Sequence, residues 1–384
     1  MTEEKSFRTN AIHSGEPRPP LCGSVVPPLF QGATYEFFGE PNEGPVRYAR
    51  LSNTPNHVIL NTKLATLEGG EAGLVTASGM AAISTSLLAL IPPGGHLLAQ
   101  ENLYGGTFQF LNEDFPKLGR RVTFFGENDL ADLGRFMEKD TRAIYVESVS
   151  NPLMKILDLN AVVSFARKNK LFSFVDNTFP SPVNFNPLAL GFDIVLHSAT
   201  KYLNGHTDVI AGAVIGRKEH VQLIGRLLKH LGGALDPFAA YLLNRGIKTL
   251  AVRVAYQNES ALKLAQNLEK HPKIRAVAYP GLPSHPQHAR AKELFRGFGG
   301  MLAFEYEGTG AEADRFLKRL KLPFVAPSLG GVETLVTRPV LTSHSWFSPE
   351  ELKRQGVGES LVRVSVGIED TQDLIEDFNS ALKN

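Results

Sequence analysis

The sequence predicts an α/β protein with a mostly parallel β-sheet, preceded by an extended arm and followed by a smaller α+β unit. Short, mainly apolar runs recur along the chain, and longer segments with helical spacing lie between several of them. Strands buried on both faces read as continuous apolar runs, and a helix between two such strands implies a parallel crossover. Prolines that interrupt the first 53 residues indicate the arm.

Residues 1–53 are interpreted as this N-terminal arm. Seven prolines between positions 17 and 45 repeatedly break any regular element that could form there. An irregular segment of this length is costly to leave loose. We therefore expect the arm to wrap a partner surface.

Residues 54–245 form the expected large domain. Apolar residues at helical spacing predict helices at 57–67 and 159–168. The charge-free stretch 72–100 is interpreted as a buried helix and not as a membrane span, because hydroxyl residues interrupt it and a Pro-Pro-Gly-Gly turn cuts it off. Short apolar runs that we expect to be strands occupy 97–99, 122–125, 143–146, 171–175, 194–196 and 211–215.

Residues 246–384 form the expected small domain. A long helical region at about 239–269 could link the two domains. Beyond it, two strands and two helices are predicted, which is a smaller α+β unit. The strands are expected at 301–305 and 361–365, and the helices at 310–320 and 370–382.

The composition excludes several classes of protein. The 384 residues carry a net charge of +1, which argues against a protein that mainly grips nucleic acid or an anionic membrane. The single cysteine, Cys22, cannot form an internal disulfide, which favours a cytoplasmic location. No spacing typical of a metal site, no Gly-x-Gly-x-x-Gly and no Walker A motif occurs, so we expect no metal, nicotinamide or NTPase site.

Two of the apolar runs are followed by residues that can carry chemistry. Asp176 follows the run at 171–175, and Lys201 follows the run at 194–196. Open α/β sheets bind ligands at the carboxyl ends of their strands. Taken alone, such an aspartate is often a helix cap and such a lysine is usually solvated. A carboxylate can also keep a pyridine nitrogen protonated, and a lysine in a low-dielectric pocket can lose its proton and form a Schiff base.

A phosphate site is indicated where Gly79 and Met80 begin an apolar helix. The free N–H groups at a helix start bind phosphate, although Ser-Gly at such a position is often only a turn and a cap. Together with Lys201 and Asp176, this helix start supplies the groups that pyridoxal 5′-phosphate requires. Tyr104 offers an aromatic ring to cover a face of the cofactor.

Several long motifs resemble the Cys/Met-metabolism family of pyridoxal-phosphate enzymes. The resemblance runs from Thr9 to the C-terminal helix and implies the fold of type I pyridoxal-phosphate enzymes. Its most specific segment is Ser-Ala-Thr-Lys-Tyr-Leu-Asn-Gly-His at 198–206. Further matching segments are 175–179, 103–107, 328–333 and 363–370.

The resemblance implies roles for individual residues. Lys201 would bind the cofactor covalently and shuttle protons, Asp176 would pair with the pyridine nitrogen, and Tyr104 would stack on the ring and protonate the leaving group. His197 and His206, which flank the lysine, are interpreted as structural. The phosphate cup would consist of Gly79, Met80, Ser198 and Thr200. The clamp on the substrate carboxylate would consist of Arg363, Ser328 and Asn151.

The resemblance also assigns a role to the arm. Tyr48 and Arg50 match a pair that reaches into the phosphate site of a neighbouring subunit, so the smallest active unit would be a dimer and the assembly a homotetramer of two dimers. The family's motif continues Asn-Pro-Thr, whereas this chain has Asn-Thr-Pro at 53–55. Arg338 adds a positive charge near the expected substrate side, and the sequence assigns it no role.

The activity expected from the resemblance is that of a carbon–sulfur lyase acting on a sulfur amino acid. Cystathionine γ-lyase is favoured narrowly, because residues 279–288 resemble the lyase. Cystathionine γ-synthase stays open, since residues 147–153 resemble the synthase and Glu333 occurs in both patterns. Methionine γ-lyase is disfavoured by Gly106, where those enzymes commonly carry cysteine. A catalytically silent paralogue that binds pyridoxal phosphate is the alternative from a different class.

Overall fold

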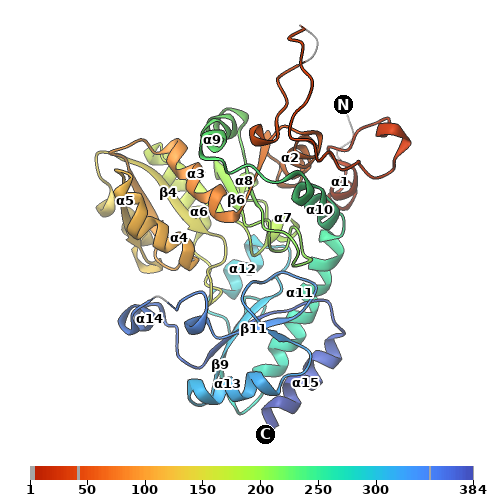
Figure 1. The fold of residues 1–384 in the computed structure, drawn as a ribbon. Helices are drawn as coiled ribbons and strands as arrows, with labels where there is room; N and C mark the ends of the chain where they lie inside the picture. Colours follow the sequence, from red (N-terminus) through yellow and green to blue (C-terminus); the bar gives the residue numbers. More distant parts are fainter. Residues whose placement is uncertain (1–4, 41–43, 346, 384) are drawn as a thin grey trace.

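The structure is a computed structural model that describes residues 5–40, 44–345 and 347–383 (Figure 1). Its larger part is a seven-stranded sheet between two layers of helices, as expected for an α/β fold. In sheet order the strands are β1 (Ala72–Thr76), β7 (Gly212–Gly216), β6 (Ile194–His197), β5 (Phe172–Asp176), β4 (Thr141–Glu147), β2 (His96–Gln100) and β3 (Arg121–Phe125).

The sheet is mostly parallel, which confirms the expected fold class. Neighbouring strands from β6 through β3 pair in parallel, and only β7 runs antiparallel to its neighbours β1 and β6. The parallel strands therefore bring their carboxyl ends to one edge. This edge carries Asp176 at the end of β5, Glu147 at the end of β4 and His197 at the end of β6.

The charge-free stretch 72–100 is helical only in part. It contains β1, which was not expected, then the buried helix α3 (Gly79–Leu90), then β2, which includes the strand expected at 97–99. Helix α3 begins where it does because the Ser78 hydroxyl accepts a hydrogen bond from the amide of Ala81, at 3.0 Å. The apolar composition of the stretch reflects burial of both strands and helix, because continuous apolar runs do not distinguish the two.

Helices cover both faces of the large sheet. Alternate strand residues serve the two layers: Leu97 packs with α3 and α9, whereas Leu98 packs with α2, α6 and α10. The helices of this domain are α2 (Pro55–Glu68), α3, α4 (Gly105–Gln109), α5 (Phe115–Lys117), α6 (Leu159–Asn169), α7 (Ser181–Asn184), α8 (Pro187–Leu190), α9 (Lys218–Leu231) and α10 (Pro237–Ile247), with the shorter turns η3 (Phe110–Asp114) and η4 (Glu127–Phe136).

The arm is less irregular than its prolines suggest. A short helix, α1 (Phe7–His13), lies ahead of the first proline and packs against α2 and the long helix α11. Two single helical turns follow, η1 (Leu21–Gly23) and η2 (Ala49–Leu51). Between these turns the arm forms extended loops that project from one end of the molecule (Figure 1).

The small domain is a five-stranded sheet covered by three helices. The helical region expected at 239–269 is two helices, α10 and α11 (Leu250–Leu268), and α11 runs from the large domain into the small one (Figure 1). In sheet order the strands are β10 (Phe324–Val325), β11 (Leu335–Thr337), β12 (Leu361–Ser365), β9 (Met301–Tyr306) and β8 (Ile274–Ala278). Its other helices are α12 (His288–Leu294), α13 (Gly310–Arg319), α14 (Pro349–Gln355) and α15 (Thr371–Lys383), with the turn η5 (Pro339–Leu341).

The core of the small domain is aromatic. Phe304 of β9, Phe316 of α13 and Phe378 of α15 are fully buried and pack ring against ring, together with apolar residues of α11. This core fixes β12 as a central strand, with antiparallel neighbours on both sides. Among the residues that the structure describes, no helix is both long and apolar enough to cross a membrane.

Candidate active site

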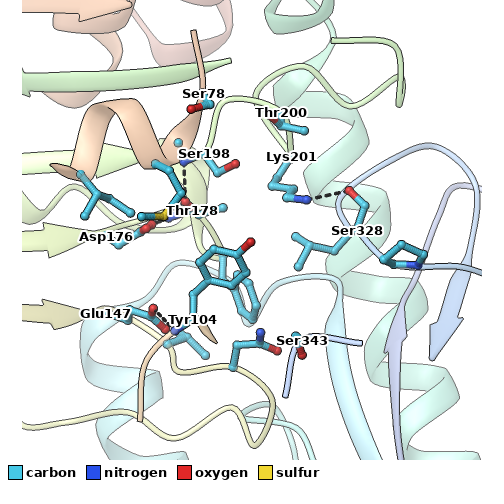
Figure 2. Close-up of a pocket in the computed structure, with 18 of the residues that line it drawn as sticks. Ser78, Tyr104, Glu147, Asp176, Thr178, Ser198, Thr200, Lys201, Ser328 and Ser343 are labelled. Carbon is cyan, nitrogen blue, oxygen red and sulfur yellow. Dashed lines mark hydrogen bonds between the residues drawn. The ribbon is translucent and has the colours of Figure 1, made fainter. Parts of the chain in front are cut away.

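A cavity of about 580 Å³ lies between the carboxyl edge of the large sheet and the small domain. Ten of the twelve residues predicted as site residues line it, and they come from segments far apart in the sequence (Figure 2). These ten are Gly79, Met80, Tyr104, Asn151, Asp176, Ser198, Thr200, Lys201, Ser328 and Arg363. The fold therefore brings the predicted groups of the large and small domains into one place.

Two carboxylates stand side by side at the sheet edge. Asp176 and Glu147 occupy paired positions on β5 and β4, and both line the cavity. The side chain of Asp176 accepts hydrogen bonds from the amide (2.9 Å) and hydroxyl of Thr178. Burial still raises the pKa of Asp176. Burial and the neighbouring charge of Asp176 raise the pKa of Glu147 well above its ordinary value. Glu147 therefore holds a proton more firmly than an ordinary glutamate does.

The start of α3 forms a cradle against the loop that follows β6. A side chain at Gly79 would bring its Cβ within 2.8 Å of the Ser198 Cβ, so only glycine lets the two backbones approach this closely. The amide of Ser198 is fixed by the Thr178 hydroxyl at 2.8 Å, and the Thr200 hydroxyl bonds to the backbone of Ala211. Helix amides and hydroxyl groups gathered in this way suit a phosphate.

Lys201 extends into the cavity toward the small domain. Its Nζ donates a hydrogen bond to the Ser328 hydroxyl, at 2.7 Å, and the two side chains point toward one another in Figure 2. Burial and the nearby charge of Arg363 lower the pKa of Lys201 to about 8. An amine with this pKa is partly neutral near pH 7, and the neutral form is the nucleophile.

Ser328 has a backbone conformation that L-residues rarely adopt, with φ of +82°. This conformation directs its hydroxyl to Lys201 and its carbonyl to Arg363. The amide of Gly330, two residues further on, donates to the Ser365 hydroxyl at 2.8 Å. A strained residue at the contact between two cationic side chains is typical of a functional site.

Arg363 approaches the cavity from the central strand β12. Its guanidinium donates to the Asn151 side chain at 3.2 Å and to the Ser328 carbonyl at 2.9 Å. Its Nε is buried and has no hydrogen-bond partner among the described residues. Burial lowers the pKa of Arg363 to about 10. A buried guanidinium that lines a cavity fits an anionic ligand such as a carboxylate.

Tyr104 stands in the middle of the cavity wall. Its backbone amide donates to the Glu147 carboxyl at 2.6 Å, and its ring projects into the space between Asp176 and Lys201 (Figure 2). The residue is 43% exposed in the single chain. A Cβ at Gly106 would lie 2.7 Å from this ring, so a larger residue there would displace it.

These groups fit pyridoxal 5′-phosphate. The cavity combines an amine of lowered pKa, a carboxylate at the end of the adjacent strand, a glycine cradle at a helix start and an aromatic ring. The guanidinium of Arg363, which lines the same cavity, adds a position for a substrate anion. Fold and cavity together define the class of protein, which is an α/β enzyme that depends on pyridoxal phosphate.

The chain belongs to the Cys/Met metabolism PLP-dependent enzyme family, whose sequence profile matches residues 8–383. Among its relatives are the Arabidopsis thaliana cystathionine gamma-synthase 1 (40% identical, 97% of this chain and 68% of the relative) and the Bacillus subtilis cystathionine gamma-lyase (40% identical, 98% and 99%). A Fusobacterium nucleatum L-methionine gamma-lyase is also 40% identical, over 100% of this chain and 99% of its own.

Solved structures share the fold over nearly the full chain. A Xanthomonas oryzae cystathionine gamma-synthase in complex with aminoacrylate and cysteine has a TM-score of 0.94 and 36% identity, covering 99% of this chain and 98% of its own. A Campylobacter jejuni putative O-acetylhomoserine (thiol)-lyase, whose structure contains pyridoxyl-lysine monophosphate, has a TM-score of 0.94 and 31% identity, covering 99% and 100%. The type I fold and the dependence on pyridoxal phosphate are thus established for this chain.

Two predicted site residues do not reach the cavity of their own chain. Tyr48 and Arg50 lie on the arm, and the Arg50 guanidinium donates to the Lys229 carbonyl at 3.1 Å. The departure at 53–55 has a local explanation: Asn53 bonds to the backbone of Tyr48 and Val46, and Pro55 takes the first turn of α2. The expectation that Tyr48 and Arg50 contribute to the phosphate site of a neighbouring subunit stays a prediction.

Arg338 does not line the cavity, contrary to its expected place near the substrate. Its guanidinium pairs with Asp314 at 2.6 Å, and its Nε donates to the Glu359 carbonyl at 2.8 Å. These contacts link α13 to the segments that adjoin β11 and β12. Its charge is therefore balanced inside the small domain.

Sequence reasoning missed Glu147 and Thr178 as members of the site. Both line the cavity, and Thr178 bridges Asp176 to Ser198 through its hydroxyl. Glu147 ends β4 as Asp176 ends β5, so the rule that ligands meet the carboxyl ends of strands could have found it. Thr178 lies two residues past β5, in the same edge loop as Asp176.

Proposed function

We propose that this enzyme is a cystathionine γ-lyase, which converts cystathionine and water to cysteine, 2-oxobutanoate and ammonia. The observation that carries the proposal is the arrangement of Lys201, Ser328 and Arg363. A lysine of lowered pKa shares one serine with a buried guanidinium that lines the same cavity. An amino acid whose carboxylate binds the guanidinium presents its α-carbon to the lysine.

Four groups of this chain would hold the cofactor. Lys201 binds it covalently, Asp176 pairs with the pyridine nitrogen, and Tyr104 covers a face of the ring. The phosphate sits in the cup formed by Gly79, Met80, Ser198 and Thr200. Pyridoxal phosphate, when bound, stabilises the negative charge that develops on substrate carbon.

The protons would be moved by residues of the cavity wall. With the substrate in place, Lys201 Nζ removes the α-proton, and Arg363 together with Asn151 keeps the carboxylate fixed while it does so. The Tyr104 hydroxyl gives a proton to the departing sulfur.

The carboxylate of Glu333, which does not line the cavity, supports cystathionine as the substrate. Glu333 accepts a hydrogen bond from Thr207 at 3.0 Å, and it follows the Gly330-Gly331 turn that packs against the backbone of Lys201 and Tyr202. Cystathionine carries a second ammonium group far from its reacting carbon, which a carboxylate at this position suits. Methionine has no such group, and this favours cystathionine over methionine.

Cystathionine γ-synthase is the second candidate. The same residues would support γ-replacement, in which a cysteine thiol takes the place of water and an O-acyl-homoserine supplies the acceptor carbon. Cystathionine gamma-synthases are among the related proteins, and one of them is solved in complex with aminoacrylate and cysteine. The intact Lys201, Tyr104 and Arg363 argue against a catalytically silent paralogue.

A paired assay tests the proposal. The purified enzyme with pyridoxal phosphate is given cystathionine in one reaction, and O-succinylhomoserine with cysteine in the other. The lyase releases 2-oxobutanoate from cystathionine at least as fast as cystathionine accumulates in the second reaction. Cystathionine that accumulates far faster than it breaks down would make the enzyme a synthase, and absence of any turnover would support the silent paralogue.

The assembly and location are also part of the proposal. A homotetramer of two dimers would let Tyr48 and Arg50 of one subunit complete the phosphate site of another. Tyr48 is 39% exposed on the single chain, and the two side chains stack with the Arg50 guanidinium 5.7 Å from the ring. The exposed thiol of Cys22 favours a reducing, cytoplasmic environment.

A further inference from the structure

A buried carboxylate and a buried imidazole lie behind the cavity wall, outside the groups assigned above. Glu68, the last residue of α2, is 1% exposed, and His197, the last residue of β6, is 2% exposed. Glu68 Oε1 and His197 Nε2 are 2.6 Å apart. The carboxylate of a glutamate this deeply buried is costly unless its charge is compensated.

The direction of the hydrogen bond between Glu68 and His197 follows from the other partners of Glu68. The side-chain amides of Asn177 and Asn186 donate to the two carboxylate oxygens of Glu68, at 3.1 and 3.2 Å. Both oxygens therefore act as acceptors, as expected for an ionised carboxylate. His197 Nε2 accordingly carries the hydrogen that it shares with Glu68.

His197 lies near Asp176 in the sheet, on the other face. Asp176 pairs with Leu196 across β5 and β6, so His197 is one residue beyond that pair at the same edge, and its side chain leaves the face of the sheet on which α2 packs. Asn177, which follows Asp176, is bonded to Glu68 as well, and the Ser148 hydroxyl links Asn177 to the Asp176 carbonyl at 2.8 Å. Glu68 thus holds the residues that flank Asp176 on two strands.

The other nitrogen of the imidazole is unpartnered. His197 Nδ1 is buried and has no hydrogen-bond partner within the described part of the chain. A neutral imidazole would leave the Glu68–His197 pair with a full negative charge in the interior, beside the carboxylates of Asp176 and Glu147. A protonated imidazole makes the pair neutral and sets a positive charge across the sheet from Asp176, which outweighs the cost of a buried Nδ1–H without a partner among the described residues.

We propose that Glu68 keeps His197 protonated and that this imidazolium, across the sheet from Asp176, keeps Asp176 ionised for its contact with the pyridine nitrogen. The inference rests on the role given to Asp176 in the proposed function. His197 is then a positioning and charge-setting residue that touches neither cofactor nor substrate. The charge of His197 lowers the pKa of Asp176 and opposes the effect of burial. Arg296, whose side chain donates to Asn186 at 2.7 Å, is a further cation that faces Glu68.

The first test measures His197 directly in the apoprotein, independently of any activity. Nitrogen NMR of ¹⁵N-histidine-labelled protein reports whether one or both ring nitrogens carry a proton, and the His197→Gln variant identifies the signal. At pH 7.5 we expect both nitrogens to be protonated in the wild type and one in Glu68→Gln, which keeps a hydrogen-bond acceptor and loses the charge. A neutral His197 in the wild type overturns the proposal.

The second test follows the bound cofactor. Loss of ionised Asp176 removes the proton from the pyridine nitrogen, and a less positive ring makes the imine with Lys201 easier to protonate. In Glu68→Gln the pH midpoint of the visible absorption change should therefore rise by about one unit. Asp176→Asn should shift it in the same direction, and an unchanged midpoint in Glu68→Gln overturns the proposal.

Kinetics separate this role from a merely structural one. Glu68→Gln should lower kcat about tenfold and leave KM within about twofold, because the carboxylate clamp is untouched. Adding His197→Gln to Glu68→Gln should lower kcat little further, since both act through one charge. Equal losses in kcat and in the stability to urea, with an additive double variant, would show a structural role and overturn the proposal.

The chain offers a matched control for Glu68→Gln. His96 and Glu138 form a second histidine–glutamate pair, 3.6 Å apart, at the opposite edge of the same sheet. Glu138→Gln makes the same chemical change far from the cavity and should leave the absorption midpoint unchanged. If no substrate is turned over at all, the lyase assignment fails. The NMR and absorption measurements still test whether Glu68 keeps His197 protonated.

Discussion

The cavity wall and the arm differ in how they hold their functional side chains. Lys201 and Arg363 are enclosed by two domains of one chain, and both bond to Ser328. Tyr48 and Arg50 are exposed, and their side chains contact each other and one backbone carbonyl. The wall is therefore complete when one chain has folded, whereas the arm pair has its function only if a second chain supplies a surface.

The arm itself contains both kinds of residue, some enclosed by their own chain and some exposed. The side chain of Glu16 is buried between two lysines, with its Oε1 at 3.0 Å from Lys63 Nζ and 2.7 Å from Lys248 Nζ. Helix α1 packs beside this cluster on α2 and α11. The beginning of the arm thus belongs to the core of its own chain, and the part around Tyr48 is the part that we propose serves a neighbouring subunit.

The largest effect is expected at the cavity wall, for Lys201→Ala. This variant loses the amine that binds the cofactor and moves the α-proton, so turnover of cystathionine should fall by at least about 10⁴-fold. The yellow colour of the protein with pyridoxal phosphate should vanish on dialysis. Lys155→Ala, at a lysine outside the cavity, is the control. Retention of colour by the Lys201→Ala variant would refute the assigned role of Lys201.

The second effect sharpens the role of the clamp. Arg363→Lys keeps one positive charge and loses the planar pair of donors, so kcat/KM should fall about a hundredfold, mostly through KM. Arg338→Lys is a matched control, because Arg338 is a buried arginine of the same domain that pairs with Asp314 outside the cavity. Similar KM changes in both variants would mean that Arg363 acts only through the fold.

The strand pattern was sufficient to predict only part of the cavity wall, and Arg363, Ser328 and Asn151 came from the family resemblance. Asp176 follows one apolar run directly and Lys201 lies in the loop after another, and parallel strands must bring such positions to one edge. The contacts that tune these residues could not be predicted in this way. Glu68 ends a helix more than 100 positions before Asp176 in the chain, and its partnership with His197 depends on the packing of α2 under the sheet.

The prediction of secondary structure from the sequence failed where a uniformly apolar composition hides the periodicity. Residues 72–100 are apolar for most of their length, so β1 could not be told from the helix that follows it, and the short strands β8, β10 and β11 lack a long apolar run. In the arm, prolines correctly indicated loops, but they said nothing about α1, which precedes them. The buried Glu16 cluster joins residues 47 and more positions apart, and only the tertiary fold shows it.

The third prediction tests whether the beginning of the arm is part of the core. Glu16→Gln leaves Lys63, which is fully buried, without its counter-charge, so the free energy of unfolding in urea should fall by about 2 kcal/mol at pH 7. Burial raises the pKa of Glu16, but hydrogen bonds from Lys248 and Lys63 outweigh it and lower the pKa below 4.5. A lowered carboxyl pKa stabilises the fold above the unfolded value, and this stability is lost as pH falls through the folded pKa.

Lowering the pH therefore distinguishes the effect of losing the Glu16 charge from the effect of changing the packing around it. Between about pH 5 and pH 3 the wild type should lose more stability than Glu16→Gln, and the two unfolding curves should converge. A constant difference between them at every pH would show that the glutamine is simply a worse fit. Activity per folded molecule should be the same in both proteins, since Glu16 does not line the cavity.

The smallest effect is expected for the projecting part of the arm. Arg50→Ala should weaken retention of pyridoxal phosphate about tenfold, because one charge-assisted phosphate contact is worth roughly 1.5 kcal/mol. The measurement is the cofactor concentration that restores half of the activity after dialysis. Arg18→Ala is the control, since Arg18 is also an arm arginine and contacts His13 of its own chain at 3.4 Å.

If Arg50 serves a neighbouring site, mixing Arg50→Ala subunits with inactive Lys201→Ala subunits should restore tight retention in the hybrid. In that hybrid, the intact Arg50 of one subunit faces the site that contains the intact Lys201 of the other. Retention that stays weak in the hybrid would place the function of Arg50 within its own chain.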